Sequence, residues 1–444
     1  MAGSSARQPR IVIVGAGFGG LSAAQALAHT AADVTVIDRT NHHLFQPMLY
    51  QVATGQLSGD QIASPIRSVL ARQKNAEVLM AEVSGVDTEA RQVLAGGQRI
   101  PYDYLIVATG AEYNYFGREE WRPLAPSLKS LADAALIREK VLDAFERAER
   151  DPDPARVRRR LTFVLVGGGP TGVEMAGAVA ELARTTLRRD FRRVDPTKAR
   201  IVLVEAGKTL LKGFGGELPA QAMGRLTALG VELRLGERVT AITDTSVTLG
   251  AETIDADTVI WTAGVKASPA AQWLGVAADP TGRVMVEPDL SVPGHPEVFV
   301  IGDAACVRAE RRNVIGRPIP DPDGSLKPLP GIAQPAIQEG KYAACVVRRR
   351  IRRLAAPPPF VYRDKGNLAA VGRAFAIADL GRVRMWGFVA WVVWLVVHIW
   401  YLIGFANRLL VITQWAIAYL TGQRTGRIIS TDVEHIAPEA ASAV

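Results

Sequence analysis

Two glycine-rich segments of this chain have the residue types and the spacing of turns that bind phosphate groups. The first, GAGFGG at residues 15–20, follows the β-branched run RIVIV and precedes the small-residue stretch LSAAQALA. In such a turn Gly15 allows the tight bend, Gly17 lets the backbone approach a pyrophosphate, and Gly20 lets the following helix pack close to the strand. The helix N-terminus adds free N–H groups and the positive end of a dipole. The pattern predicts a dinucleotide site.

The carboxylate that such a site needs follows the next expected strand. Residues 33–37 (DVTVI) lead directly to Asp38, where a carboxylate can accept hydrogen bonds from both hydroxyls of a ribose. An isolated glycine turn is a weak signal. A turn with strands on both sides and an acid in place favours nucleotide binding strongly over an incidental bend.

The same order of strand, glycine turn, helix, strand and acid recurs in the middle of the chain. The run LTFVLV is followed by GGGPTG at residues 167–172, by VEMAGAVAEL, and by RIVLV, which leads to Glu205. Two complete units predict two dinucleotides. We attribute the longer path to Glu205 to a helix that continues through the basic stretch 184–193. A carboxylate at Glu205 repels a 2′-phosphate and favours NADH over NADPH, although Lys208 nearby and a structural role for Glu205 leave alternatives open.

Three further apolar runs end in small residues. They are residues 104–110 (YLIVATG), 259–264 (VIWTAG) and 298–304 (VFVIGDA), and the first two suit chain crossings between two nucleotide-binding domains. Asp303 follows a glycine at the end of the third run. A lone Gly-Asp turn is common, but after two dinucleotide units it indicates a carboxylate that binds the ribityl chain of FAD.

The bulk composition fits a large globular protein. The chain has 444 residues, 48% hydrophobic and 22% charged, which predicts two or three domains with their own cores. Its net charge of +8 attracts anions in general and does not choose among nucleotides, nucleic acid and an anionic membrane. Cys306 and Cys345 are the only cysteines, so a disulfide framework and a four-thiolate metal site are excluded, and we expect no bound metal. The first ten residues lack the apolar core of a secretory signal, which predicts a cytoplasmic N-terminus.

These motifs, taken in order, resemble a known superfamily. RIVIVGAGFGG, YLIVATG, FVLVGGGPTGVE and VFVIGDAA are similar to the two-dinucleotide flavoproteins related to glutathione reductase, in which the first unit holds FAD and the second the nicotinamide cofactor. Segments 41–55, 333–340, 362–379 and 391–411 resemble one branch, the type II NADH:quinone oxidoreductases. This resemblance implies that NADH reduces FAD and that FAD reduces a membrane quinone, without proton pumping, in respiratory electron transport. It also implies monotopic attachment to the cytoplasmic face of the inner (cell) membrane and a homodimer.

The fold expected from this resemblance is α/β. It has two Rossmann-like dinucleotide-binding domains, for FAD and NAD, plus a C-terminal membrane-anchoring helical segment. The expected FAD domain is discontinuous, at residues 8–113 and 285–355, and the NADH domain at 114–284 is inserted into it. Residues 356–444 would form flavin-adjacent strands and membrane-anchoring helices.

Carried over residue by residue, the resemblance assigns the turns and strand ends to the two nucleotides. For one FAD per chain it implies Gly15, Ala16, Gly17, Phe18, Gly19, Gly20, Asp38, Arg39, Gln46, Pro47, Tyr50, Val83, Ala108, Thr109, Gly110, Gly302, Asp303, Ala333 and Gln334. For NADH it implies Gly167, Gly169, Pro170, Thr171, Gly172, Glu174, Glu205, Ala263 and Gly264.

Four side chains would take part in the chemistry. Gln334 and Gln338 would lie on the quinone side of the flavin ring, and Lys365 near its N1–C2=O edge, where a cation stabilises reduced flavin. Glu174 would lie between the nicotinamide, flavin and quinone sites. Each has an ordinary alternative: a helix N-terminal charge for Glu174, a solvated turn for Lys365, and an exposed polar helix face for the two glutamines.

The C-terminal region contains a run, residues 386–406, without Asp, Glu, Lys or Arg, which is long enough for a transmembrane helix. However, tryptophans and tyrosines are spread along it and past it. Arginines also bracket it: Arg382 and Arg384 precede the run, and Arg408, Arg424 and Arg427 follow it. This pattern is typical of helices that lie in the membrane interface, which we favour over a single span or burial in a soluble fold. His398 is expected to be a packing residue.

Two other functions fit less of the sequence. A disulfide or sulfide:quinone reductase of the same architecture needs two neighbouring thiols, whereas Cys306 and Cys345 are far apart in sequence. A non-enzymatic redox sensor or a nucleic-acid-binding flavoprotein is suggested only by the positive charge. No aromatic-basic motif is visible, so no nucleic-acid partner is expected.

Overall fold

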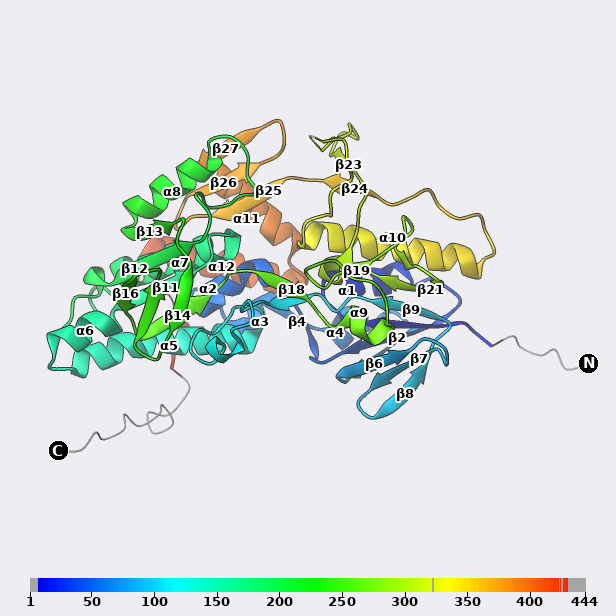
Figure 1. Ribbon diagram of the computed structural model, residues 1–444, viewed down its shortest axis with the longest axis horizontal. Helices are drawn as coiled ribbons and strands as arrows, with labels where there is room; N and C mark the ends of the chain where they lie inside the picture. The colour runs from blue at the N-terminus through cyan, green and yellow to red at the C-terminus, as the bar shows by residue number, and fades with distance from the viewer. Residues whose placement is uncertain (1–6, 322, 423, 425, 430–444) are drawn as a thin grey trace, which may run out of the picture. The chain divides into compact units, whose positions relative to one another are not determined.

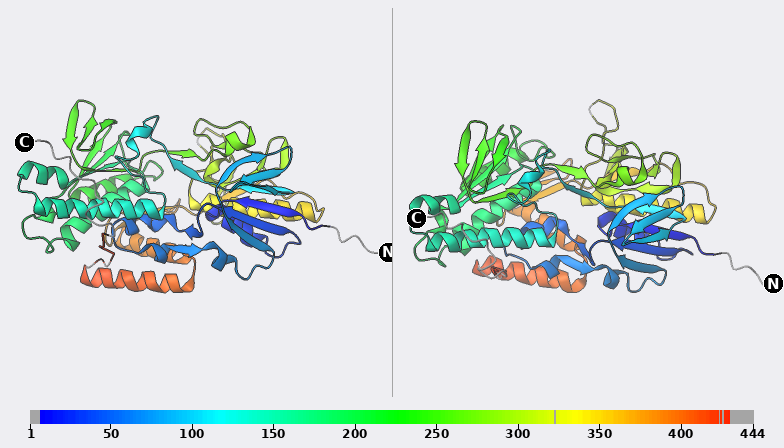
Figure 2. Two further views of the ribbon diagram at one scale, coloured as in Figure 1. Left: turned by 90° about the horizontal axis from the view of Figure 1, so that it is seen from below. Right: turned by 60° about the horizontal axis from the view of Figure 1, so that its bottom comes forward.

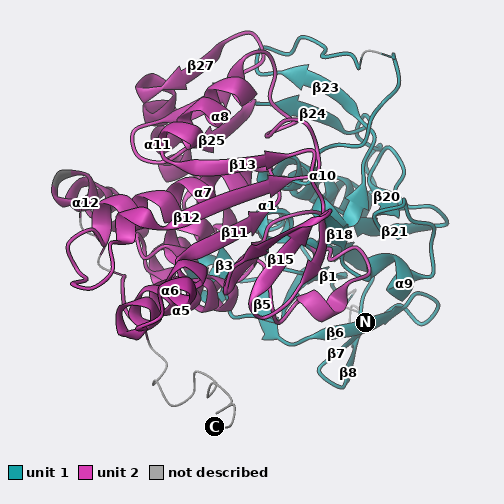
Figure 3. Cartoon of the chain, turned by 60° about the vertical axis from the view of Figure 1, so that its left-hand side comes forward, with its two compact units in different colours: residues 1–44, 64–112, 265–365 teal, residues 45–63, 113–264, 366–444 magenta. Residues whose placement is uncertain are grey.

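The computed structural model describes residues 7–321, 323–422, 424 and 426–429. They belong to two compact units, teal and magenta in Figure 3. Unit 1 consists of residues 1–44, 64–112 and 265–365, and unit 2 of residues 45–63, 113–264 and 366–444. The expectations for the first six residues and for the chain beyond residue 429 lie outside the described part.

Unit 1 is built on a six-stranded sheet in the order β20-β21-β9-β1-β2-β5 (Figure 1). All its strand pairs are parallel except β20 with β21. The strands are β1 (Arg10–Val14), β2 (Asp33–Asp38), β5 (Ala76–Met80), β9 (Tyr104–Val107), β20 (Ser291–Val292) and β21 (His295–Val300). Strand β1 lies in the middle of the sheet and is almost wholly buried, which explains its unbroken apolar run.

Two helices of unit 1 pack closely because glycines line their contact. Helix α1 (Phe18–Ala26) lies against α10 (Ala333–Ile351). A Cβ at Gly340 would come within 2.2 Å of the Gly19 carbonyl oxygen, so a side chain is excluded there. The remaining elements of this unit include α4 (Ile66–Leu70), the antiparallel strands β6 (Val83–Asp87), β7 (Gln92–Ala95) and β8 (Gln98–Pro101), α9 (Ala270–Leu274), β22 (Ala305–Cys306), and the pair β23 (Glu310–Asn313) and β24 (Val361–Asp364).

Unit 2 repeats the same plan with a four-stranded parallel sheet, β13-β12-β11-β17. Its strands are β11 (Thr162–Val166), β12 (Arg200–Glu205), β13 (Val231–Leu235) and β17 (Thr258–Trp261), with α7 (Pro170–Glu181) after β11 and α8 (Leu218–Ala228) before β13. An antiparallel sheet, β14 (Val239–Ile242), β15 (Ser246–Leu249) and β16 (Glu252–Asp255), shares its core. Helices α5 (Leu131–Arg150) and α6 (Pro154–Arg160) precede β11. The α/β fold with two Rossmann-like sheets is thereby confirmed.

The C-terminal part of unit 2 is a three-stranded antiparallel sheet and two helices. The strands are β25 (Asn367–Ala370), β26 (Ala376–Asp379) and β27 (Arg384–Gly387), followed by α11 (Phe388–Tyr401) and α12 (Phe405–Thr421). The chain breaks between the two helices at Gly404, whose φ of +90° suits glycine. In Figure 2, α12 (orange-red) runs along the outside of its unit. Within the described ranges, no helix is long and apolar enough to cross a membrane.

The two units divide the chain differently from the domain boundaries expected from the sequence. Residues 45–63 and 366–444 group with the second dinucleotide domain, and residues 265–284 group with the first. These segments are assigned to a different unit than expected because they pack on elements distant in sequence. For example, α2 (Leu49–Ala53) packs on α5 and α7.

The expected continuation of α7 through residues 184–193 is wrong. The helix changes to a π-helical turn at Leu182–Thr186 and ends; residues 188–190 form a turn and residues 192–194 a bend. A helix would bring the arginines of this stretch close together and leave their repulsion unrelieved. Instead, the Glu149 carboxylate accepts the N–H groups of Arg192, Arg193 and Val194.

Candidate functional site

The first glycine turn joins β1 to α1 and leaves one position open. At Gly15, whose φ is +97°, an added Cβ would lie 2.4 Å from the carbonyl oxygen of Ala108. At Gly20, an added Cβ would lie 1.8 Å from the carbonyl oxygen of Gly15. The protein's own backbone therefore excludes side chains at both positions. A Cβ at Gly17 would meet nothing within 4 Å. A glycine that packing does not require fits a backbone that must approach a ligand, and α1 begins at the next residue.

Asp38, the last residue of β2, lies beside this turn. Its Oδ2 accepts the N–H of Ala16 at 2.7 Å, and its Oδ1 accepts the N–H and the hydroxyl of Thr40, each at 2.8 Å. These bonds orient the carboxylate toward the turn. Because a carboxylate has about four acceptor positions, it can still accept a ribose hydroxyl.

The second glycine turn repeats this geometry in unit 2. At Gly167, whose φ is +117°, an added Cβ would lie 2.7 Å from the backbone nitrogen of Ala263. At Gly172, an added Cβ would lie 1.8 Å from the carbonyl oxygen of Gly167. Gly169 again has nothing within 4 Å, and α7 begins one residue later at Pro170. Both turns thus fit a pyrophosphate in the same way.

Glu205 ends β12 beside the second turn. Its two oxygens accept the N–H groups of Gly168 at 2.8 Å and Gly207 at 2.7 Å, and the Lys212 ammonium lies 3.3 Å away. Burial opposes its ionisation, but these partners outweigh burial and lower the pKa of Glu205 below the ordinary value. The side chain is therefore ionised at neutral pH, and the cation that pairs with it is Lys212.

Some of the other predicted residues lie next to the two turns. In unit 1, Ala108 and Thr109 follow β9 and lie against Gly15, and Gly110 comes next in the chain. Val83 begins β6 and is buried. In unit 2, Ala263 follows β17 and lies against Gly167, and Gly264 comes next in the chain.

A hollow at the end of β21 brings two carboxyl groups together in unit 1. Gly302, Asp303, Gly331 and Glu339 are among the residues that line it. Glu339 is 2% exposed and accepts the Gly302 N–H at 2.6 Å. Burial, aided by the charge of Asp303 and opposed by that hydrogen bond, raises the pKa of Glu339 to about 8. Sequence reasoning missed Glu339, although it lies inside the segment AQPAIQEG.

The two glutamines of α10 have different roles. They lie one turn apart, as expected, but the Gln338 amide donates to the Arg363 carbonyl and accepts the Arg363 N–H, each at 3.0 Å. Gln338 therefore holds β24, the strand that precedes the exposed Lys365. Gln334 is half-buried, and within the described part of the chain its amide has no hydrogen-bond partner. Of the two, Gln334 keeps an amide available for a ligand.

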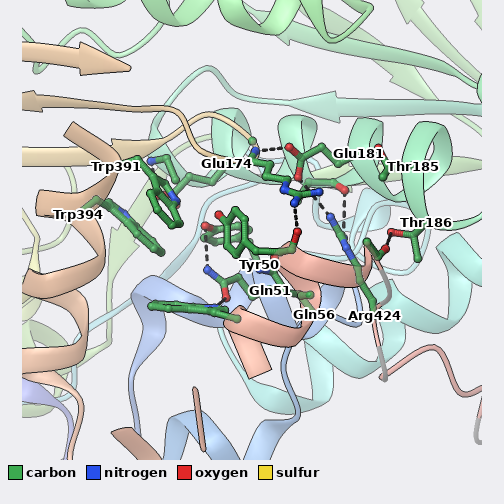
Figure 4. A pocket seen from close by; sticks show the side chains of 18 residues that line it. Tyr50, Gln51, Gln56, Glu174, Glu181, Thr185, Thr186, Trp391, Trp394 and Arg424 are labelled. Carbon is green, nitrogen blue, oxygen red and sulfur yellow. Dashed lines mark hydrogen bonds and ion pairs between the residues drawn. The ribbon is translucent and has the colours of Figure 1, made fainter. Parts of the chain in front are cut away.

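Unit 2 contains a cavity of about 690 Å³, counting its opening to solvent (Figure 4). Its walls include Trp391, Trp394 and Trp415 of α11 and α12 and Glu174 of α7. Glu174 is buried and accepts the Ala370 N–H at 3.3 Å. Burial raises the pKa of Glu174 to about 8, only partly offset by that bond, so the carboxyl group holds its proton at neutral pH.

The segment expected to line the flavin lies in this same unit. Gln46 and Pro47 belong to a 3₁₀ turn (Gln46–Met48), and Tyr50 lies on the following helix α2. Tyr50 lines the cavity with Glu174, and burial, with the nearby Glu174 charge, raises its pKa well above the ordinary value. The structure thus brings together two residues that the sequence assigned to different nucleotides.

A buried ion pair closes one side of the cavity. Arg424 donates to the carbonyl oxygens of Thr54 at 3.0 Å and Ala178 at 3.2 Å, and it lies 3.5 Å from Glu181 of α7. Sequence reasoning counted Arg424 only among the arginines near a membrane. The pairing of Arg424 with Glu181 could not be inferred, because the two residues are far apart in the chain.

Two Rossmann-like sheets, each with an open glycine turn and an acid at the next strand end, define a protein of the two-dinucleotide class. Residues 9–340 match the family described as pyridine nucleotide-disulphide oxidoreductase, to which this chain belongs. Within that class, the chain belongs to the type II NADH:quinone oxidoreductases. It is 42% identical to the type II NADH:quinone oxidoreductase Ndh of Mycobacterium tuberculosis, over 97% of this chain and 92% of that protein.

Solved structures with low sequence identity share the fold. NDH2 from Plasmodium falciparum in complex with NADH has a TM-score of 0.84 at 22% identity and covers 96% of this chain and 100% of that one. The sulfide:quinone oxidoreductase of Aquifex aeolicus has a TM-score of 0.67 at 18% identity, with 89% and 90% covered. Cys306 and Cys345 are both free thiols. The similarity to a type II NADH:quinone oxidoreductase, at 42% identity, is much higher than the 18% identity to the sulfide:quinone oxidoreductase. It favours NADH over sulfide as the electron donor.

Proposed function

We propose that this chain is an FAD-dependent NADH:quinone oxidoreductase that reduces a membrane quinone to quinol without proton pumping. The single observation that carries the proposal is the match to a type II NADH:quinone oxidoreductase over nearly the whole of both chains. The two glycine turns also support the proposal, because the reaction needs two nucleotides. One would be the resident FAD and the other the substrate NADH.

The residues of this chain bind and orient the two nucleotides. The turn before α1 and Asp38 hold FAD, and the turn before α7 and Glu205 hold NADH. When bound, FAD supplies the redox chemistry, because its ring takes a hydride from NADH and passes two electrons to the quinone. Orientation of the reactants supplies most of the rate enhancement, and no side-chain nucleophile is needed.

Quinone reduction also consumes protons, and Glu174 is placed to deliver one. It is protonated at neutral pH and lines a cavity walled by aromatic side chains, which suits a quinone ring. In unit 1, we propose that Gln334 contacts the quinone side of the flavin ring and that Lys365 stabilises its N1–C2=O edge. Gln338 contributes by holding the strand before Lys365.

We further propose monotopic attachment to the cytoplasmic face of the membrane through α11 and α12. Large apolar side chains are exposed on both helices, namely Phe388, Val389, Val396, Trp400, Leu409, Leu410 and Ile412. Arg382 and Arg384 precede α11, and Arg408 lies in α12, where they can bind anionic lipid headgroups. Attachment would let a lipid-soluble quinone reach the enzyme. The homodimer rests on the family resemblance.

The decisive experiment separates the two half-reactions. The protein purified in detergent should show FAD absorbance, lose it on addition of NADH, and regain it on addition of a short-chain quinone. Bleaching by NADPH but not by NADH would overturn the role of Glu205. A reduced flavin that no quinone reoxidises would overturn the assigned acceptor.

A further inference from the structure

A chain of two hydrogen bonds connects α12 to the cavity of unit 2. The indole Nε1 of Trp415 donates to Gln51 Oε1 at 2.8 Å, and Gln51 Nε2 donates to the Tyr50 hydroxyl oxygen at 3.1 Å. All three side chains are buried, with exposed fractions of 3%, 2% and 7%. Figure 4 shows Tyr50 and Gln51 at the cavity, beneath Glu174.

The direction of this chain is fixed by chemistry. An amide can usually be turned over without changing its shape, so its oxygen and nitrogen are hard to assign. Here an indole N–H can only donate, so the oxygen of Gln51 must face Trp415 and its NH₂ group must face Tyr50. The Tyr50 oxygen then receives a hydrogen bond, and its own hydrogen is left to be donated elsewhere.

The cavity is the place where that hydrogen can go. Tyr50 lines the cavity, and within the described ranges its hydroxyl donates to no protein acceptor. A second donor points to the same kind of ligand: Trp394 also lines the cavity, and its buried indole nitrogen has no partner among the described residues. Because buried donors rarely stay unpaired, the cavity is built for a ligand that carries acceptor oxygens.

We propose that Tyr50 donates a hydrogen bond to a ring carbonyl of the quinone in this cavity, and that Gln51 and Trp415 are positioning residues that fix this donor direction. The proposal rests on the proposed function and names a residue that recognises its acceptor. It also gives Trp415, a buried residue of α12, a task inside the protein. A phenol that stays neutral is suited to this, since a phenolate could not donate.

The first test compares Tyr50→Phe, Gln51→Leu and Trp415→Phe by steady-state and half-reaction kinetics. Tyr50→Phe should raise KM for a short-chain quinone roughly tenfold, the loss expected for one well-formed hydrogen bond. The effect should fall on flavin reoxidation by quinone more than on bleaching by NADH. Gln51→Leu and Trp415→Phe should raise the same KM by a smaller factor, because the hydroxyl remains but loses its fixed direction.

Combined variants distinguish positioning from general damage. Adding Trp415→Phe to Tyr50→Phe should cause no further rise in KM, because the hydroxyl that Trp415 directs is already gone. Trp121→Phe serves as the matched control, since Trp121 is buried in another part of unit 2, and it should leave this KM unchanged. FAD content and thermal midpoint of each variant report folding.

A spectroscopic measurement tests the bond itself. With a ¹³C-carbonyl quinone, the bound C=O stretch should lie below its free frequency in the wild type and move back toward it in Tyr50→Phe and Trp415→Phe. Effects of Trp415→Phe and Tyr50→Phe that simply add, or a bound stretch that Tyr50→Phe leaves unchanged, would overturn the inference. A wild type that reduces no quinone would instead overturn the proposed function.

Discussion

Acidic side chains of this protein differ in charge state because their surroundings differ. Glu205 receives two backbone N–H groups and a lysine, which lower its pKa. Among the described residues, Glu174 and Glu339 are buried with one N–H partner each, and burial raises their pKa to about 8. As an anion, Glu205 can therefore repel a phosphate group or accept hydrogen bonds, whereas Glu174 and Glu339 can hold a proton.

Replacing Glu205 should relax the choice of nicotinamide cofactor. In Glu205→Ala the anion that we propose to repel a 2′-phosphate is lost, together with the proposed acceptor for the ribose hydroxyls. We expect the ratio of kcat/KM for NADH to that for NADPH to fall by roughly ten- to a hundredfold, measured by flavin-dependent quinone reduction with each donor. Glu232→Ala removes an acid of the neighbouring strand β13 that pairs with Arg200, and it should leave the ratio unchanged.

The proton of Glu174 should appear in the pH profile of flavin reoxidation. Below its pKa of about 8 the group holds the proton that quinone reduction consumes, so the wild-type rate should fall as pH rises through about 8. Glu174→Gln should be slower below that pH and lack the inflection. Stopped-flow reoxidation by quinone measures both, and an unchanged profile in the variant would assign the proton to another group.

At the scale of the elements, each glycine turn contains glycines that are there for two different reasons. Gly20 and Gly172 have no room for a side chain because the turn's own backbone lies against them, whereas Gly17 and Gly169 face open space. We attribute the lack of room at Gly20 and Gly172 to folding, and the glycines at 17 and 169 to the proposed approach of a phosphate.

Alanine at these positions should distinguish the two reasons. Gly20→Ala should destabilise or prevent folding, since its Cβ would lie 1.8 Å from a backbone oxygen. Gly17→Ala should fold with native circular dichroism yet bind FAD at least about tenfold more weakly, because the added methyl group occupies the phosphate's place. A Gly17→Ala protein with full flavin content would show that the open position is not the pyrophosphate site.

The exposed apolar face of the C-terminal helices should govern membrane binding. Trp400 is 73% exposed at the end of α11, and Trp400→Ser should weaken partition into vesicles with anionic lipid several-fold. Leu136 is similarly apolar and exposed on α5, so Leu136→Ser is the control and should partition like the wild type. Co-sedimentation measures both, and equal binding of all three proteins would remove α11 from the proposed interface.

At the scale of the whole molecule, the buried carboxyl groups link stability to pH. For Glu339, the unfolded chain loses the proton near its ordinary pKa of about 4.3, whereas the folded chain keeps it up to about 8. The stability that this proton contributes is complete at low pH and is lost as pH rises toward 8, by about 1.4 kcal/mol per pH unit.

Glu339→Gln should reduce this dependence, since an amide keeps the acceptor for the Gly302 N–H and does not titrate. The thermal midpoint of the flavin-loaded variant should fall less than that of the wild type between pH 5.5 and 7.5. Parallel curves for the two proteins would mean that Glu339 is not protonated in the folded state.

Much of the fold followed from local sequence. Strand, glycine turn and helix are adjacent in the chain, and the acids Asp38 and Glu205 end the next strand, so short-range pattern was enough to predict both Rossmann-like sheets. The error in α7 arose where local pattern misled: residues 184–193 have helix-forming composition, but the backbone N–H groups there bind Glu149, a distant residue.

The amino-acid sequence by itself predicted the two glycine turns and their acids, because each turn and its acid lie within one strand-turn-helix-strand unit. Only the tertiary structure decided the composition of the cavity in unit 2. Its residues come from several elements, among them α2, α7, β25, α11 and α12, and from Arg424, and their contacts depend on packing between segments hundreds of residues apart. The burial that raises the pKa of Glu174, and the hydrogen bonds from Trp415 through Gln51 to Tyr50, exist only once those segments have come together.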